Sequence, residues 1–214
     1  QNRCQLSMHA MGGRAIDRIV DRVYPEDSWT EGDVPHLRME HWTEPSLRAI
    51  QKSAEKGLAV VTQPIFLYAE IESYLANLGE TRMQRTYPIQ TMLRAGVPVC
   101  FSTDAPATSW AVPSDPFPCL KGAVTRTAWD GTNCGPEQAV DIETAIQLYT
   151  RESARIAGFP HMGQLKAGYR ANFIILSEDI LAVDPKRIDQ VYVTATYVDG
   201  VKVYSRAEAE KGEP

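Results

Sequence analysis

Cysteine is scarce in this chain of 214 residues and follows no recognisable spacing. The cysteines are Cys4, Cys100, Cys119 and Cys134. No two of them have the CxxC spacing of a zinc ribbon or a thiol redox motif, and they are too few for a disulfide framework at this length. We therefore expect reduced thiols and a cytoplasmic location.

Long apolar runs and basic clusters are also missing. No run reaches the about 18 apolar residues of a membrane span, and the first residues lack the apolar core of an export signal. The chain has 22 Lys and Arg against 27 Asp and Glu, which gives a net charge of −5 without any block of positive charge. We expect no nucleic-acid partner and no membrane partner, and this balance favours a small-molecule substrate.

Three short apolar runs each end on a side chain that can bind a metal. The runs are QLSMH, which ends at His9, PHLRMEH, which ends at His41, and VPVCFSTD, which ends at Asp104. A helix-like segment follows each run, and this alternation predicts parallel strands joined by helices. Because the carboxyl ends of such strands meet at one mouth of an α/β barrel, we expect the three side chains to converge there.

The periodicity divides the chain into a large α/β part and a small β part. Strands are expected at 5–9, 37–41, 57–63 and 99–102, and helices at 14–24, 44–57, 66–78, 88–93 and 141–158. These elements form a domain at 1–160 that carries the metal-site residues, with a long loop from Asp104 to Pro118. A small antiparallel β portion is expected at 161–206, because Asp199-Gly200 is a strong hairpin signal, and 207–214 is expected to be a frayed tail.

Each candidate residue also has a structural explanation. A histidine at the end of an apolar strand is often an ordinary hydrogen-bonded residue, and Asp104 could simply cap a loop. Trp42, Gln63 and Trp110 are candidate substrate-binding residues, although the tryptophans could equally pack the loops. Alternation along 37–41 places Arg38 and Glu40 on the helix side of their strand, as a structural pair.

Several motifs resemble one enzyme family. HAMGGRAID around His9, RMEH at His41 and STDAP around Asp104 are similar, in order, to motifs of the metal-dependent amidohydrolase superfamily. The match is to amidohydrolase family 3, the group that includes N-substituted formamide deformylase-like enzymes. The segments GQLKAGYRANFIIL and TATYVDGVKVY are similar to the β portion that ends those proteins.

The resemblance implies a (β/α)8 barrel of which this chain supplies the carboxyl-terminal half, strands five to eight, with a small antiparallel appendage. It implies that His9, His41 and Asp104 bind a divalent metal, with zinc favoured, and that Asp104 moves the proton. The family's HxH strand and its bridging residue have no counterpart here, and Gly13 stands where the family usually has aspartate. One or two ions are expected in the complete enzyme, and the isolated chain is expected to be inactive, with no bound ion as an open alternative.

The function expected from the resemblance is hydrolysis of a non-peptide carbon–nitrogen bond, such as an N-acyl or N-formyl amide, by metal-activated water. One alternative is a catalytically incomplete half-barrel that serves as an interaction module, and a weaker one is deamination or phosphoester hydrolysis on the same barrel. Four strands alone would expose inward apolar side chains, at a cost on the order of 10 kcal/mol. We therefore expect either a homo-oligomer or a missing amino-terminal half.

Overall fold

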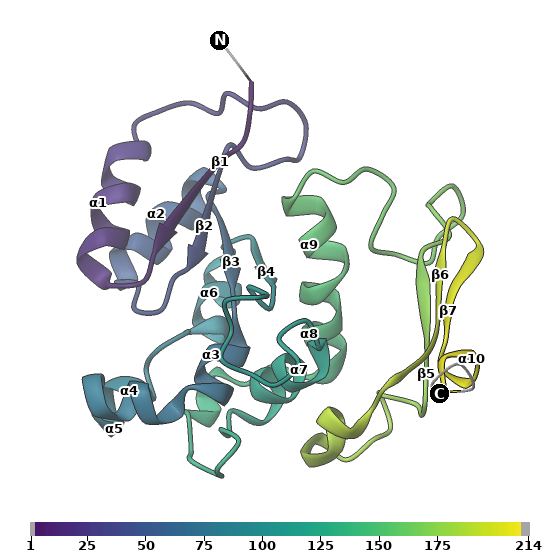
Figure 1. The fold of residues 1–214 in the computed structure, drawn as a ribbon. Coiled ribbons are helices and arrows are strands. Elements are labelled where there is room, and N and C mark those ends of the chain that lie inside the picture. Colours follow the sequence, from purple (N-terminus) through teal and green to yellow (C-terminus); the bar gives the residue numbers. More distant parts are fainter. Residues whose placement is uncertain (1–2, 211–214) are drawn as a thin grey trace.

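The parallel sheet determines where the chemistry-bearing residues lie. The computed structural model describes residues 3–210 (Figure 1). The sheet has four parallel strands in the order β1-β2-β3-β4, namely β1 (Leu6–Ala10), β2 (Leu37–His41), β3 (Ala59–Thr62) and β4 (Val99–Phe101). In the register, Met8 is paired with Met39, and Val60 is paired with both Met39 and Val99. The carboxyl ends of all four strands therefore lie along one edge, as the alternation predicts.

Helices connect these strands and follow the last one. They are α1 (Gly13–Val23), α2 (Leu47–Lys56), α3 (Pro64–Ala69), α4 (Ile71–Leu78), α5 (Glu80–Met83), α6 (Ile89–Ala95), α7 (Pro116–Thr125), α8 (Ile142–Tyr149) and α9 (Arg151–Ile156), with a short 3-10 helix η1 (Pro136–Gln138). The apolar stripe of α1 is buried, and α2 begins at a Ser46 cap and ends at Gly57, which has a left-handed backbone.

The structure corrects the expected helices in three places. The helix expected at 66–78 is divided at Glu70, and the one expected at 141–158 is divided at Thr150. Helix α7 begins inside the segment expected to be a long loop. Its start has a clear local signal, since the Asp115 carboxylate accepts a hydrogen bond from the Phe117 amide at 3.0 Å and Pro116 occupies the first turn.

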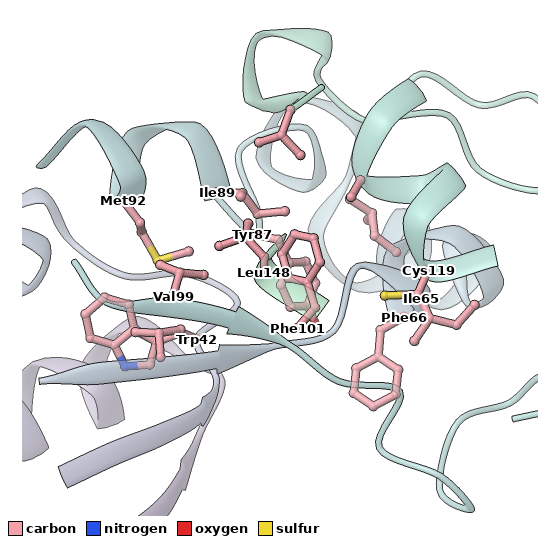
Figure 2. Close-up of a cluster of buried hydrophobic side chains, with 14 of the residues drawn as sticks. Trp42, Ile65, Phe66, Tyr87, Ile89, Met92, Val99, Phe101, Cys119 and Leu148 are labelled. Carbon is pink, nitrogen blue, oxygen red and sulfur yellow. The ribbon is translucent and has the colours of Figure 1, made fainter. Parts of the chain in front are cut away.

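One continuous apolar core lies between the parallel sheet and its helices. Figure 2 shows Trp42 beside Val99 and Met92, with Phe101 farther along the same cluster. Met39 and Val60 belong to this core as well. The residues of one face of the sheet thus pack against the helices, and the opposite face is left for other contacts.

Helix α9 covers part of that opposite face. Ile156 of α9 forms a separate buried cluster with Ala59, Val61 and Cys100. The Ser153 hydroxyl donates to the Phe101 carbonyl at 2.9 Å, which ties α9 to β4. In Figure 1, α9 stands between the parallel and the antiparallel sheets. The expectation that the inward apolar side chains are uncovered is therefore wrong for β3 and β4, because a helix of the same chain covers them.

The antiparallel sheet is a separate layer formed by the end of the chain. It contains β5 (Phe173–Leu176), β6 (Val193–Val198) and β7 (Val201–Ser205), with the 3-10 helix η2 (Pro185–Gln190) before β6 and α10 (Arg206–Ala209) after β7. β6 and β7 are joined at Asp199-Gly200, as the hairpin signal predicts. η2 attaches this layer to α7 through an ion pair of 2.8 Å between Asp189 and Lys121. Part of the tail expected to be frayed, at 207–214, belongs to helix α10, and 211–214 lie outside the described residues.

Within residues 3–210, no helix has the length and apolar character that crossing a membrane requires.

A buried arginine joins two loops of the α/β part. The Arg126 guanidinium is 2% exposed and donates to four backbone carbonyls at 2.6 to 3.3 Å, those of Thr86, Tyr87, Cys134 and Gly135. Burial lowers the pKa of Arg126 to about 10, so the side chain stays charged near neutral pH. Its charge is balanced by carbonyl dipoles, which makes the group a structural clamp.

Replacing this clamp should be costly. We expect Arg126→Met to lower the free energy of unfolding by on the order of 3 kcal/mol, because it leaves buried carbonyl groups without donors. Urea unfolding followed by circular dichroism measures the change. The matched control is Arg85→Met at an exposed position, which should stay within about 0.5 kcal/mol of the parent. Equal stability of the two variants would contradict the clamp.

Candidate metal centre

A cavity lies at the carboxyl edge of the parallel sheet. Its volume is about 750 Å³, and His9, His41 and Asp104 all line it. The His9 and His41 rings approach edge to face, with centroids 4.4 Å apart. The structure therefore places the three predicted residues around one space, with the two imidazoles in direct contact.

His41 reaches the cavity through an unusual backbone turn. Leu37 and Met39 of β2 point into the helix-side core, and strict alternation would send His41 the same way. The backbone of His41 has φ 75°. The Trp42 amide is shared between the Glu40 carbonyl at 3.2 Å, which is a γ-turn contact, and the Ala10 carbonyl of β1 at 3.0 Å. This turn reverses the alternation, so His41 faces the cavity and Trp42 enters the core.

The His41 ring contacts Gln63 and Phe66 in addition to His9. Its Nδ1 lies 2.9 Å from Oε1 of Gln63, and its face stacks on Phe66 with centroids 5.6 Å apart. Burial and the neighbouring His9 lower the pKa of His41, while the Gln63 hydrogen bond and Asp104 act in the opposite direction. The net effect favours the neutral imidazole, which is the form that binds metal ions.

Asp104 lies in the loop that follows β4. Its backbone is left-handed with φ 56°, a conformation that aspartate tolerates better than most residues. The loop is closed by the Ala107 amide, which donates to the Asp104 carbonyl at 2.8 Å, and by the Thr108 hydroxyl, which donates to the Thr103 carbonyl. The half-buried Asp104 side chain thus lines the cavity from the side of β4, while His9 lines it from β1.

The floor of the cavity is polar beneath the histidines. Arg38 and Glu40 line it and form an ion pair of 3.0 Å, and the Ser7 hydroxyl donates to Glu40 at 2.7 Å. The prediction that Arg38 and Glu40 form a pair is confirmed, but their expected position on the helix side is wrong. The cavity face is occupied by the residues that alternate with the core residues Leu37 and Met39.

A cysteine also lines the cavity but is not activated. Burial raises the pKa of Cys100 to about 12. The thiol is therefore protonated near neutral pH and lacks the thiolate that a nucleophile needs.

His9, His41 and Asp104 are residue types that bind divalent metals, but the described residues bring too few of them together for a complete site. Two neutral imidazoles and a carboxylate are ligands that suit Zn²⁺ and related ions. Among residues 3–210, however, no group of three or more His, Cys, Asp or Glu side chains is close enough together to hold one ion. His9, His41 and Asp104 therefore share a cavity without forming a complete set of ligands.

The three candidate substrate-binding residues lie in different places. Trp42 is fully buried in the helix-side core and donates from its indole N–H to the Met39 sulfur at 3.0 Å, so it does not line the cavity. Trp110 packs edge to face on Tyr68, also away from the cavity. Gln63 is 1% exposed and contacts His41 instead of the open space.

Sequence reasoning missed the contribution of α3 to the site. Phe66 of α3 and Glu70, the residue that directly follows α3, line the cavity, and Phe66 stacks on the His41 ring. The strand ending in Gln63-Pro64 carried a signal for this, because a polar residue at the carboxyl end of a buried strand points to the same edge as His41.

Comparisons with known proteins agree with this architecture. The sequence model described as the amidohydrolase family matches residues 1–204. The chain is 30% identical over 203 residues to the N-substituted formamide deformylase of Arthrobacter pascens, covering 94% of this chain and 36% of that protein. It is 25% identical to the putative amidohydrolase YtcJ of Bacillus subtilis, covering 95% of this chain and 38% of that protein.

A solved structure shows the same fold. An uncharacterized metal-dependent hydrolase from Pyrococcus horikoshii superposes with a TM-score of 0.70 and 25% identity, covering 85% of this chain and 35% of that chain. This chain therefore spans little more than a third of the length of the proteins it matches.

The position of Trp42 is testable by stability. We expect Trp42→Ala to lower the free energy of unfolding by about 3–5 kcal/mol, because it empties a large volume in the core. Thermal and urea unfolding measure the loss. Trp129→Ala, at a tryptophan that is 52% exposed, is the matched control and should cost well under half as much. A Trp42→Ala protein as stable as the parent would place the indole outside the core.

Proposed function

Because this chain belongs to the amidohydrolase family, we propose that it forms part of a metal-dependent hydrolase acting on carbon–nitrogen bonds other than peptide bonds. The observation that carries the proposal is the shared cavity of His9, His41 and Asp104, with the imidazole centroids 4.4 Å apart. An N-formyl or N-acyl amine is the proposed substrate class, because the Arthrobacter pascens relative is an N-substituted formamide deformylase.

In this proposal, the residues have separate roles. His9 and His41 bind a divalent ion, with zinc favoured by the two imidazoles. When bound, such an ion lowers the pKa of a coordinated water to about 7. Asp104 is a further ligand from this chain. It also takes the proton of the attacking water and returns it to the departing nitrogen, a role that suits a half-buried carboxylate on the cavity wall.

We further propose that the α/β part is the carboxyl-terminal half of a (β/α)8 barrel. Its four strands are parallel and lie in chain order, which is the arrangement of consecutive barrel strands. The chain also covers little more than a third of its relatives. The other half would supply the remaining ligands for one or two ions and would pair with the open edge of β1. Alternatively, a second copy of this chain would cover that edge. We also propose a cytoplasmic location, since four cysteines without disulfide-type spacing suit a reducing compartment.

The second candidate is a catalytically incomplete module that binds a partner through the same face. It is favoured by one observation, that no three-ligand group exists among residues 3–210. Metal content and activity of the complete polypeptide separate the two candidates, and the same assays applied to deamination and phosphoester substrates test the weaker alternative.

The first prediction of the hydrolase proposal concerns metal binding. In the complete polypeptide that contains this chain, we expect His41→Ala to weaken binding of the divalent ion by at least about 100-fold, since even loss of a residue behind a ligand costs 10–100-fold. Elemental analysis and zinc titration measure it. The control is His161→Ala, because His161 is exposed and lies outside the cavity. A parent protein that binds no divalent ion would support the incomplete module instead.

The second prediction concerns proton transfer. We expect Asp104→Asn to lower kcat for hydrolysis of an N-formyl amine by about 10²–10⁴-fold, which is the usual contribution of a positioned acid or base. Release of formate measures the rate in the complete polypeptide. Asp27→Asn, at an exposed carboxylate that does not line the cavity, is the control and should keep the parent rate. An Asp104→Asn protein with full activity would remove Asp104 from the chemistry.

A further inference from the structure

Gln63 is buried directly behind the His41 ring. It follows β3, is 1% exposed, and does not line the cavity that His41 lines. Its side chain makes three hydrogen bonds. Oε1 lies 2.9 Å from Nδ1 of His41, and Nε2 donates to the Val61 carbonyl at 3.2 Å and to the Ser102 hydroxyl at 2.9 Å.

These contacts fix which way the Gln63 amide faces. The Val61 carbonyl can only accept a hydrogen bond, so the group beside it must be the NH₂ of the amide. A flipped amide would bring its oxygen against the Val61 carbonyl oxygen at about the same 3.2 Å and would take away the donor that Gln63 supplies to this carbonyl, which is costly in a buried site. The oxygen of Gln63 therefore faces His41.

The orientation of the amide in turn determines where the His41 ring carries its proton. Because Oε1 can only accept, Nδ1 of His41 must be the donor. The neutral ring then has its lone pair on Nε2, away from Gln63. We propose that Gln63 is a positioning residue that holds His41 as the Nδ1–H tautomer and presents the Nε2 lone pair to the cavity.

Gln63 is thereby assigned to support the proposed metal-binding residue His41, and not to contact the substrate as the sequence predicted. The tautomer follows from the hydrogen bonds alone, whereas its use in metal binding rests on the function proposed above. A ligand histidine whose second nitrogen donates to a fixed acceptor has its ring orientation and tautomer set before the ion arrives. Phe66 restricts the tilt of the same ring through stacking, so the ring is held in both position and protonation.

The tautomer can be read directly from the ring nitrogens. The chain has four histidines, so long-range ¹H–¹⁵N correlation spectra of the metal-free protein give four ring patterns, and His41→Asn identifies the pattern of His41. At about pH 8, well above the ordinary histidine pKa of about 6.5, we expect His41 to show a protonated Nδ1 and an unprotonated Nε2.

Three variants test whether Gln63 is the cause. Gln63→Leu removes the acceptor, and we expect the Nδ1–H form to fall from nearly the whole population to the mixture shown by the exposed His161. Gln63→Glu keeps an acceptor and should keep Nδ1 protonated. Ser102→Ala removes one hydrogen-bond partner of the Gln63 Nε2 but leaves the Val61 carbonyl, so the His41 tautomer should not change.

The outcomes are distinct from those of the hydrolase proposal. An Nε2–H tautomer in the parent protein, or an unchanged tautomer in a folded Gln63→Leu protein, overturns the role of Gln63. If Gln63→Leu does not fold, the parent spectrum and the Gln63→Glu and Ser102→Ala spectra still decide the matter, because each has a definite expected pattern. If the tautomer is as expected but His41→Ala leaves metal content unchanged, the positioning holds and the metal-dependent function fails.

Discussion

The positive-φ turn at His41 is the constraint on which both the core and the cavity depend. Before this turn, β2 alternates in the ordinary way, with Leu37 and Met39 in the core and Arg38 and Glu40 in the cavity. The turn reverses which face of the sheet the next side chains occupy. His41 therefore contacts His9 on the cavity face, and Trp42 contacts Met39 in the core. A strained backbone is retained here because the buried indole and the hydrogen-bonded imidazole both require it.

The two halves of the cavity face of the sheet have different chemistry. Beneath β1 and β2 the face is polar, with Ser7, Glu40 and Arg38 in one connected group. Beneath β3 and β4 it is apolar, and Ile156 of α9 covers it. The apolar half is thus satisfied within the chain, while the polar half stays open beside the histidines.

Much of this arrangement is readable from local patterns. Period-two and period-3.6 patterns located the strands and most helices, because burial of one face imposes them on the sequence. His9 follows from alternation in β1, and Asp104 from its position just past β4. The division of two helices and the early start of α7 were missed, since an interruption costs only a few local contacts and changes the apolar pattern little.

The sequence by itself determined the positions of the parallel strands, the hairpin at Asp199-Gly200 and the edge at which His9, His41 and Asp104 gather, because these depend on patterns within a few residues. Only the tertiary structure decided which face His41 uses, that Trp42 is core, and that Gln63 contacts His41 instead of the open cavity. These outcomes depend on a backbone reversal and on hydrogen bonds between separate strands. Neither feature changes the apolar periodicity of the sequence, because each depends on which residue of the neighbouring strand lies beside it.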